Sequence, residues 1–351
     1  MIFALQMIIL VVVLVVVHEM GHFLTAKLFK IKVNEFGIGF PPKLLQIRMG
    51  ETAYTLNLIP LGGFVKLEGE DGPSGPRSLA AKSPLVRAIV LSSGSLMNAI
   101  LAVAIFTSLF MIPRDMTVGE VIIDDVIANS PAQREGILPG DKVLSTNGNP
   151  IDNINDLAYQ INRNLGTEIT MTLQRGEDIK QISVEPRWRP PKGEGATGVI
   201  LRLDNPQTVS HSYSLWEAVP KGVAQCGEIL AQTWRAITHW VSGKAPAPFS
   251  GPIGIVGGSK EMVDVGGAII LIPLAGLLSI SLAIFNILPI PALDGGRLLF
   301  VIIEWMRGGK RIPPEKEGLI HMIGFALLIT LVLMVSYNDI GRLIQNDGFF
   351  R

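Results

Sequence analysis

The sequence IILVVVLVVVHEMGH, residues 8–22, places two histidines and a glutamate at the end of a strongly apolar run. Between Met1 and Val17 only Gln6 is polar. An α-helix rises about 1.5 Å per residue, so roughly 20 such residues cross the hydrocarbon core of a bilayer. We therefore expect a transmembrane helix over residues 1–29 that carries the HEMGH residues. A secretory signal peptide would have a basic start and a small-residue cleavage site, and this stretch has neither.

The HEMGH residues have the composition and spacing of a metal site. His18 and His22 are four residues apart, which puts both imidazoles on one face of a helix. Glu19, beside them, is a candidate base that would take a proton from a zinc-bound water. Without a metal, three unpaired polar side chains in an apolar helix would be destabilising. We therefore predict Zn²⁺ as the cofactor, His18 and His22 as ligands, and Glu19 as the catalytic residue.

The composition of the whole chain indicates a membrane protein. Of its 351 residues, 48% are hydrophobic and only 17% are charged, whereas an average globular domain carries roughly a quarter charged residues. The net charge is zero, so nothing suggests a nucleic-acid partner. Three further apolar segments are long enough to cross a bilayer: residues 88–112, 265–303 and 318–337. The expected fold is a polytopic α-helical membrane protein with about four transmembrane helices.

The basic residues predict an orientation in the membrane. Lysines and arginines are concentrated in two connections, between the first two spans and between the last two. By the positive-inside rule both connections are cytoplasmic, so both termini and residues 113–264 are extracytoplasmic. We therefore expect a multi-pass protein of the inner (cytoplasmic) membrane. The basic residues are Lys27, Lys30, Lys32, Lys43, Arg48, Lys66, Arg77, Lys82 and Arg87 in the first connection, and Arg307, Lys310, Arg311 and Lys316 in the second.

The third span supplies a candidate for the third metal ligand. Asp294 is the only acid between Val265 and Leu299. Because the first and third spans run in the same direction, Asp294 should lie near the same leaflet as His18 and His22. A catalytic zinc site has three protein ligands and an open position, which fits this set. Alternatively Asp294 only forms a turn, since Asp-Gly is a strong turn signal.

Taken together, these motifs point to a known family. HEMGH in a first transmembrane helix, NILPIPALDGG in a later one and a PDZ-like module between them resemble the site-2 protease family of intramembrane zinc metalloproteases. The resemblance implies zinc ligation by His18, His22 and Asp294, with Glu19 as catalytic base. Further candidate residues follow from the same resemblance, which implies that the chain breaks its helix near the metal and holds substrate there. These substrate-binding candidates are Asn286, Pro289, Pro291 and Asn98, the last of which matches a family position near the active site.

Each substrate-binding candidate has a structural alternative. Pro289 and Pro291 remove backbone donors and leave carbonyls free, which a membrane tolerates where the backbone lines a cavity or is buried in protein. Asn286 would bind a substrate carbonyl or satisfy one of those freed groups. Asn98, in the small-residue stretch SGSLMNAI, would bind substrate or make a helix contact.

Residues 30–87 are expected to form a β region on the cytoplasmic side, associated with the membrane. NEFGIGF, PKLLQIRMG, TAYTLNLIP and GGFVKLEG are short runs of β-forming residues bounded by glycine and proline. The region resembles the family's membrane-associated β-sheet, whose exposed strand edge would hold an unwound substrate segment by β-augmentation. The alternative is an ordinary solvated pair of hairpins.

Residues 116–187 are expected to form an extracytoplasmic α+β module. The run SPAQREGILPGDKVLSTNG resembles a PDZ domain of bacterial proteases. A PDZ groove lies between a strand and a helix, which suggests the strand 118–123 and a helix near residues 153–165. Any of these apolar residues is otherwise simply core. The groove candidates are Val118, Gly119, Val121, Leu157 and Ile161.

Residues 214–242 alternate apolar and polar groups at helical spacing. Trp216, Trp234 and Trp240 in this segment predict an amphipathic helix anchored at the outer membrane surface. A helix packed on the PDZ-like module would show a similar pattern.

The sequence therefore predicts an intramembrane zinc metalloendopeptidase of the site-2 protease type. Its expected partners are the lipid bilayer and single-span membrane proteins, which the resemblance suggests are anti-sigma factors or remnant signal peptides cleaved in regulated intramembrane proteolysis. Two alternatives are a PDZ-based membrane scaffold and a membrane-anchored zinc protease of substrates at the cytoplasmic surface. A scaffold has no use for Glu19, which favours the enzyme.

Overall fold

A computed structural model describes residues 2–70, 75–191, 193–243 and 251–344. The chain divides into two compact units. The helical unit comprises Met1–Phe110, Leu215–Thr233 and Pro248–Arg351, and the sheet unit comprises Met111–Ser214 and Trp234–Ala247. The two terminal segments expected outside the cytoplasm, Met1 and residues 345–351, lie outside the described residues.

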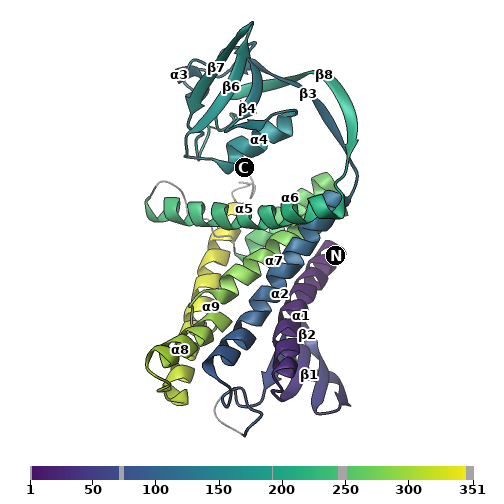
Figure 1. The fold of residues 1–351 in the computed structure, drawn as a ribbon, viewed down its shortest axis with the longest axis vertical. Coiled ribbons are helices and arrows are strands. Elements are labelled where there is room, and N and C mark those ends of the chain that lie inside the picture. Colours follow the sequence, from purple (N-terminus) through teal and green to yellow (C-terminus); the bar gives the residue numbers. More distant parts are fainter. Residues whose placement is uncertain (1, 71–74, 192, 244–250, 345–351) are drawn as a thin grey trace. The chain divides into compact units, whose positions relative to one another are not determined.

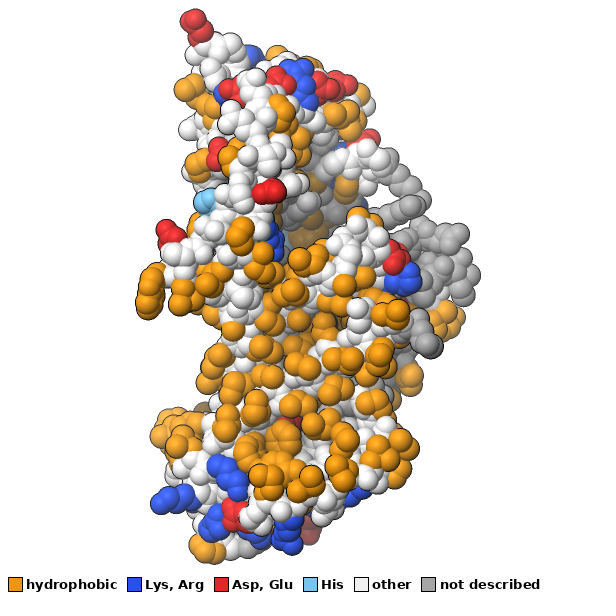
Figure 2. Space-filling view, turned by 90° about the vertical axis from the view of Figure 1, so that its right-hand side faces the viewer, with side chains coloured by type: hydrophobic (Ala, Val, Ile, Leu, Met, Phe, Trp, Pro, Cys, Tyr) orange, Lys and Arg blue, Asp and Glu red, His pale blue; other side chains and the backbone are white. Residues whose placement is uncertain are grey.

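The helical unit contains the expected membrane helices (Figure 1). Within the described residues, four helices are long and apolar enough to cross a membrane: Ile2–Leu28, Pro84–Met111, Ala268–Ile287 and Pro314–Gly341. They correspond to α1 (Ile2–Leu28), α2 (Pro84–Met111), the short η1 (Ala268–Ile270) with α7 (Leu271–Ile287), and α9 (Pro314–Ile344). Figure 2 shows a broad band of apolar side chains over this unit, with basic side chains gathered at one end. The polytopic fold class is thus confirmed.

The third span, expected over residues 265–303, begins later than expected and is interrupted where Pro289 and Pro291 predicted a break. Residues up to Gly266 complete a preceding helix, α6 (Pro252–Gly266), and α7 stops at Ile287. Irregular backbone follows until α8 (Asp294–Met306). The break has a local cause, because Pro289 and Pro291 lack N–H groups and force the residue before each of them into extended backbone. Leu288 accordingly has φ −63° and ψ 145°.

The β region of the helical unit forms one curled sheet of two long strands, β1 (Val33–Met49) and β2 (Thr52–Leu67). The four short runs expected from the sequence are the halves of these strands, which pair antiparallel with several register shifts. Glu35 lies opposite both Lys66 and Ala53, so the first half of β1 has neighbours on both sides. The sheet packs on α1 through Phe23, whose ring centroid is 5.5 Å from that of Phe36.

The sheet unit is built on one antiparallel sheet in the order β7-β6-β4-β3-β8, with the short β5 beside β4. The unit also contains two short helices, α3 and α4. Asn153 caps the start of α4, because its side-chain oxygen accepts the N–H of Asp156. The sheet extends beyond the expected limit of residue 187, because β8 pairs with β3 along its whole length. The elements are β3 (Arg114–Val126), α3 (Pro131–Arg134), β4 (Lys142–Thr146), β5 (Asn149–Pro150), α4 (Ile154–Arg163), β6 (Ile169–Arg175), β7 (Asp178–Val184) and β8 (Val199–His211).

The expected peptide groove along strand 118–123 is not open. β3 lies between β4 and β8, so both of its edges face other strands. Val118 is paired with Gln207 of β8, and a Cβ atom on Gly119 would lie 2.6 Å from the carbonyl oxygen of Asp204. The other candidates, Val121, Leu157 and Ile161, are buried together in the core of the unit. These residues hold the sheet and α4 together, as the structural alternative predicted.

The expected amphipathic helix is α5 (Leu215–Val241). Its tryptophans are largely outside the core, with Trp216 85% and Trp234 69% exposed. Large exposed indoles on an amphipathic helix fit the interfacial region of a membrane.

Candidate metal centre

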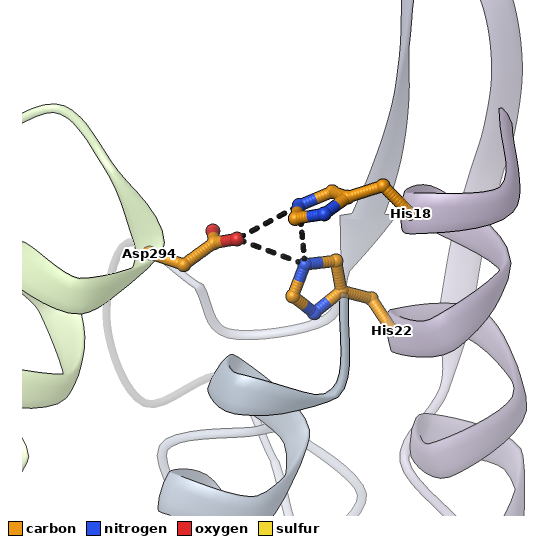
Figure 3. Close-up of side chains that lie close together, drawn as sticks. All are labelled: His18, His22 and Asp294. Atoms are coloured by element: carbon orange, nitrogen blue, oxygen red, sulfur yellow. Dashed lines mark hydrogen bonds and ion pairs between the residues drawn. The ribbon is translucent and has the colours of Figure 1, made fainter. Parts of the chain in front are cut away.

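Three side chains from two distant parts of the chain converge at one point in the helical unit (Figure 3). His18 and His22 extend from successive turns of α1, and Asp294 extends from the start of α8. Nε2 of His18 lies 2.9 Å from Oδ2 of Asp294, and Nε2 of His22 lies 3.1 Å from the same oxygen. The two Nε2 atoms are 3.3 Å apart. The structure therefore brings together the residues that the sequence suggested as ligands.

The spacing of these atoms fits a tetrahedral zinc ion. Zinc binds imidazole nitrogen and carboxylate oxygen at roughly 2.0–2.1 Å, which places any two ligand atoms about 3.3 Å apart. The observed separations of 2.9, 3.1 and 3.3 Å are close to that value. Two ring nitrogens and one carboxylate oxygen also leave a fourth position for water or substrate, as in catalytic zinc sites.

Hydrogen bonding fixes the ring orientation of one histidine. Nδ1 of His22 donates to the carbonyl oxygen of Val90 in α2, at 2.8 Å. With its proton on Nδ1, the ring presents the lone pair of Nε2 to the centre, which is the arrangement that most metal-bound histidines adopt. The sequence did not single out Val90, because it acts through its backbone carbonyl oxygen, which every residue has.

Two glycines allow α1 and α2 to meet at the site. A Cβ atom on Gly21 would lie 2.3 Å from the carbonyl oxygen of Ser93. A Cβ atom on Gly94 would lie 2.4 Å from Nε2 of His22 and 2.6 Å from Nε2 of His18. Neither position therefore has room for a side chain. Gly94 was also missed from the sequence, where the only available signal was its place in a run of small residues.

The glycines that follow Asp294 allow the chain to fold back across the break. A Cβ atom on Gly295 would lie 2.1 Å from the carbonyl oxygen of Leu288, and one on Gly296 would lie 2.4 Å from that of Ile290. The first turn of α8 is thus packed directly on the irregular backbone that precedes it. The DGG sequence places Asp294 at this crossing, facing α1.

A cavity of about 200 Å³ adjoins two of the three candidate ligands, His18 and Asp294. Glu19, Asn98 and Asn286 line it together with His18 and Asp294. Glu19, the expected base, and two of the four substrate-binding candidates therefore lie beside the metal centre. Asn98 is fully buried, and neither its Oδ1 nor its Nδ2 has a hydrogen-bond partner among the described residues.

The two prolines of the break take other positions. Neither Pro289 nor Pro291 is among the residues that line this cavity. Pro291 instead packs against α9, where a Cβ atom built on Gly324 would lie 2.3 Å from the Cβ of Pro291. The prolines shape the break, and the asparagines face the space beside the metal centre.

Comparison with known proteins identifies the family. The chain matches Peptidase family M50 over residues 6–331. It belongs to this family. The site-2 protease resemblance drawn from HEMGH and NILPIPALDGG is thereby confirmed.

Relatives from several bacteria match over nearly their full length. A protein of Clostridium perfringens is 36% identical over 336 residues, which cover 93% of this chain and 95% of the relative, and its name assigns it provisionally to the zinc metalloproteases. The zinc metalloprotease RasP of Oceanobacillus iheyensis is 29% identical, with 94% of this chain and 97% of RasP covered. RasP of Geobacillus kaustophilus is 27% identical, with 94% and 95% covered. The chain is therefore a membrane zinc metalloprotease, as the enzyme and cofactor predictions stated.

Proposed function

We propose that this enzyme hydrolyses peptide bonds within or next to the transmembrane segments of single-span membrane proteins. The observation that carries the proposal is the convergence of His18, His22 and Asp294 inside a helix bundle of membrane-spanning length. His18 lies ten residues before the end of α1, which corresponds to roughly 15 Å along the helix. Chemistry at that depth favours substrates that themselves enter the membrane.

In this proposal each polar residue beside the cavity has a separate task. A zinc ion held at this site would act as a Lewis acid and bring the pKa of a water molecule toward neutrality. His18, His22 and Asp294 hold the ion, and Glu19 accepts the water's proton and returns it to the leaving amine. Asn98 and Asn286 donate hydrogen bonds to backbone carbonyls of the bound segment. The edge of the β1-β2 sheet holds the unwound substrate as an added strand.

Metal analysis and cleavage assays of four variants test these assignments. His18→Ala, His22→Ala and Asp294→Ala should each lower bound zinc from about one ion per chain. Glu19→Gln should keep the zinc but abolish cleavage of a single-span substrate, because the base is gone while the ligands remain. Full zinc occupancy in Asp294→Ala would remove that residue from the site.

The choice of substrate separates the proposal from its two alternatives. A single-span protein with the sequence features of an anti-sigma factor or a signal-peptide remnant should be cut, and a soluble unfolded protein should not. Cleavage of the soluble protein alone would support a protease of the cytoplasmic surface. Binding without cleavage of either, in a zinc-loaded protein, would support a scaffold.

The proposed orientation follows from the basic connections. Residues 30–87 and 307–316 face the cytoplasm, and the sheet unit, which resembles a PDZ domain in its SPAQREGILPGDKVLSTNG run, lies outside in the periplasm or its equivalent. In a Cys226→Ser background, an impermeant thiol reagent applied to intact cells should modify a cysteine placed at Asp178 and spare one placed at Lys43. The opposite labelling pattern would invert the arrangement.

A further inference from the structure

The backbone immediately before Asp294 adopts a conformation that its residue type disfavours. Ala292 has φ +79°, in the left-handed region that L-residues other than glycine, asparagine and aspartate seldom occupy. This alanine is two residues before the candidate ligand and lines the same cavity. A strained residue persists only where its surroundings hold it in place, and such residues concentrate at functional sites.

One side chain of α9 holds this residue. Nδ1 of His321 accepts the backbone N–H of Ala292 at 2.8 Å. Since the amide is necessarily the donor, Nδ1 carries no proton and the ring proton is on Nε2. Nε2 has no hydrogen-bond partner among the described residues, and the nearest carboxylate oxygen, on Glu317, is 3.9 Å away. The bond to Ala292 is therefore the contact that defines the orientation of this ring.

Packing fixes His321 at that position. Its ring lies against Phe300 of α8, with centroids 5.5 Å apart. One turn further along α9, Gly324 approaches Pro291 so closely that a Cβ atom would be 2.3 Å from the proline Cβ. α9 is thus seated against the break at His321 and again at Gly324, and the ring of His321 is held between Ala292 and Phe300.

The carboxylate of Asp294 has little else to orient it. Among the described residues, the close polar contacts of this carboxylate are with Nε2 of His18 and of His22, the other two candidate ligands. His22 has an outer contact in Val90, whereas the carboxylate depends on where the backbone at residues 292–294 directs it. Outer contacts that orient metal ligands typically contribute 10–100-fold to metal affinity.

We propose that His321 is a positioning residue for the metal centre: by accepting the Ala292 N–H it holds the left-handed turn that directs Asp294 toward His18 and His22. The inference rests on the proposed zinc site and extends it to α9, one of the four candidate membrane helices of the described residues. It gives this histidine a role through backbone geometry, without contact with zinc or substrate.

The proposal predicts a specific order among substitutions at position 321. Asparagine carries its Oδ1 on Cγ, where histidine carries Nδ1, so His321→Asn retains the acceptor. Glutamine places its amide one bond further out, near the position of Nε2, and leucine has no acceptor at all. His321→Leu and His321→Gln should therefore lose zinc affinity by roughly 10–100-fold, while His321→Asn should stay within about threefold of the wild type.

A second substitution tests the link through the backbone. Glycine adopts positive φ without steric cost. In the Ala292→Gly variant the left-handed turn should therefore depend less on His321. The double variant Ala292→Gly with His321→Leu should recover a large part of the zinc affinity that His321→Leu loses. A role for His321 in general packing predicts no such recovery, because the glycine adds no contact.

The measurement is zinc retention by the full-length protein in detergent, titrated with a competing chelator, with thermal unfolding recorded for each variant. His239→Leu, which alters a histidine of the sheet unit, is the matched control and should leave zinc affinity unchanged. Wild-type affinity in His321→Leu, or equal losses in the Asn and Leu variants, would overturn the inference while leaving the zinc site intact. If His321→Leu does not fold, the comparison of Asn with Gln decides the question. A wild-type protein that binds no zinc would instead overturn the proposed site itself.

Discussion

Gly94 of α2 lies directly against the imidazole of His22, with no space for even a methyl group between them. A Cβ atom at this position would lie 2.4 Å from Nε2, the atom that faces the metal centre. Gly94→Ala should therefore displace one or both imidazoles and lower zinc affinity by roughly 10–100-fold, as loss of a ligand-orienting contact does.

Zinc retention against a chelator measures this effect, and Gly227→Ala of α5 is the matched control. Apart from the adjoining backbone of α5, no described heavy atom lies within 4 Å of a Cβ built on Gly227, and alanine is the better helix former there. The control should bind zinc like the wild type. Normal zinc affinity in Gly94→Ala would show that α2 can retreat from the site without cost.

Asn98 should contribute to activity and not to stability. It is fully buried with both polar atoms unpartnered among the described residues, and it lines the cavity beside Glu19 and Asp294. An unsatisfied buried amide costs free energy, so Asn98→Ala should leave thermal stability unchanged or raise it. If the amide binds a substrate carbonyl, kcat/KM should fall by about tenfold or more, equivalent to roughly 1.4 kcal/mol.

Cleavage kinetics and thermal unfolding of the same preparation separate the two roles of Asn98. Zinc content should be unchanged, because the asparagine is not a candidate ligand. A loss of thermal stability with unaltered kcat/KM would assign Asn98 to helix packing, the alternative that its small-residue surroundings suggested.

The sequence was most informative where a residue's chemistry conflicts with its surroundings. Histidines and carboxylates within apolar helices cost free energy unless they bind a common metal ion. Residue type and position were therefore enough to suggest the HEMGH residues and Asp294 as a site. The helix break was equally visible, because Pro289 and Pro291 exclude regular hydrogen bonding. These signals are local and need no knowledge of packing.

The remaining features depend on which backbones meet, and residue identity does not encode that. Val90 acts through its carbonyl oxygen, Gly94 through the absence of a side chain, and His321 through a backbone amide 29 residues away. The peptide groove predicted along β3 is closed for a related reason. Strand 199–211 lies beyond the limit expected for the module, and its pairing with β3 is a long-range contact.

The sheet unit should lose stability in acid through Asp141. Its carboxylate is completely buried and accepts hydrogen bonds from Nε and Nη2 of Arg175, at 2.7 and 2.8 Å, and from the backbone N–H of Leu138. Burial by itself raises the pKa of Asp141, but these hydrogen bonds outweigh it and hold the pKa below the usual 3.8. The stabilisation is therefore complete above about pH 4 and is lost as pH falls further.

Replacing this carboxylate tests both its magnitude and its pH dependence. Asp141→Asn should destabilise the unit by about 1.5–3 kcal/mol at neutral pH, the usual contribution of hydrogen bonds to a charged group. The difference from wild type should shrink below pH 4. Urea unfolding of the full-length protein, read by pulsed hydrogen exchange in peptides covering residues 169–184, measures it. Glu120→Gln, which breaks the more exposed pair with Lys142, should have little effect. A difference independent of pH would contradict the assignment.

The β-sheet segment of the sheet unit can be removed as one piece, because its two ends meet. Arg114, the first residue of β3, is paired with His211, the last residue of β8. A short flexible linker can therefore replace residues 114–211 and join α2 to α5. None of the candidate ligands His18, His22 and Asp294 belongs to this unit, so we propose that it controls substrate entry and takes no part in hydrolysis.

If the unit acts as a gate, its deletion should relax substrate selection without reducing catalysis. A single-span substrate whose outer domain has already been trimmed should be cut at about the wild-type rate, and the untrimmed substrate, resisted by the intact enzyme, should now be cut as well. A recruitment role makes the opposite prediction, because loss of a binding groove would lower cleavage of both substrates. The two substrates should be assayed side by side with the wild-type and deletion proteins, each carrying about one zinc per chain. Glu19→Gln introduced into the deletion protein is the control for contaminating proteases. A zinc-loaded deletion protein that cuts neither substrate would rule out the gate.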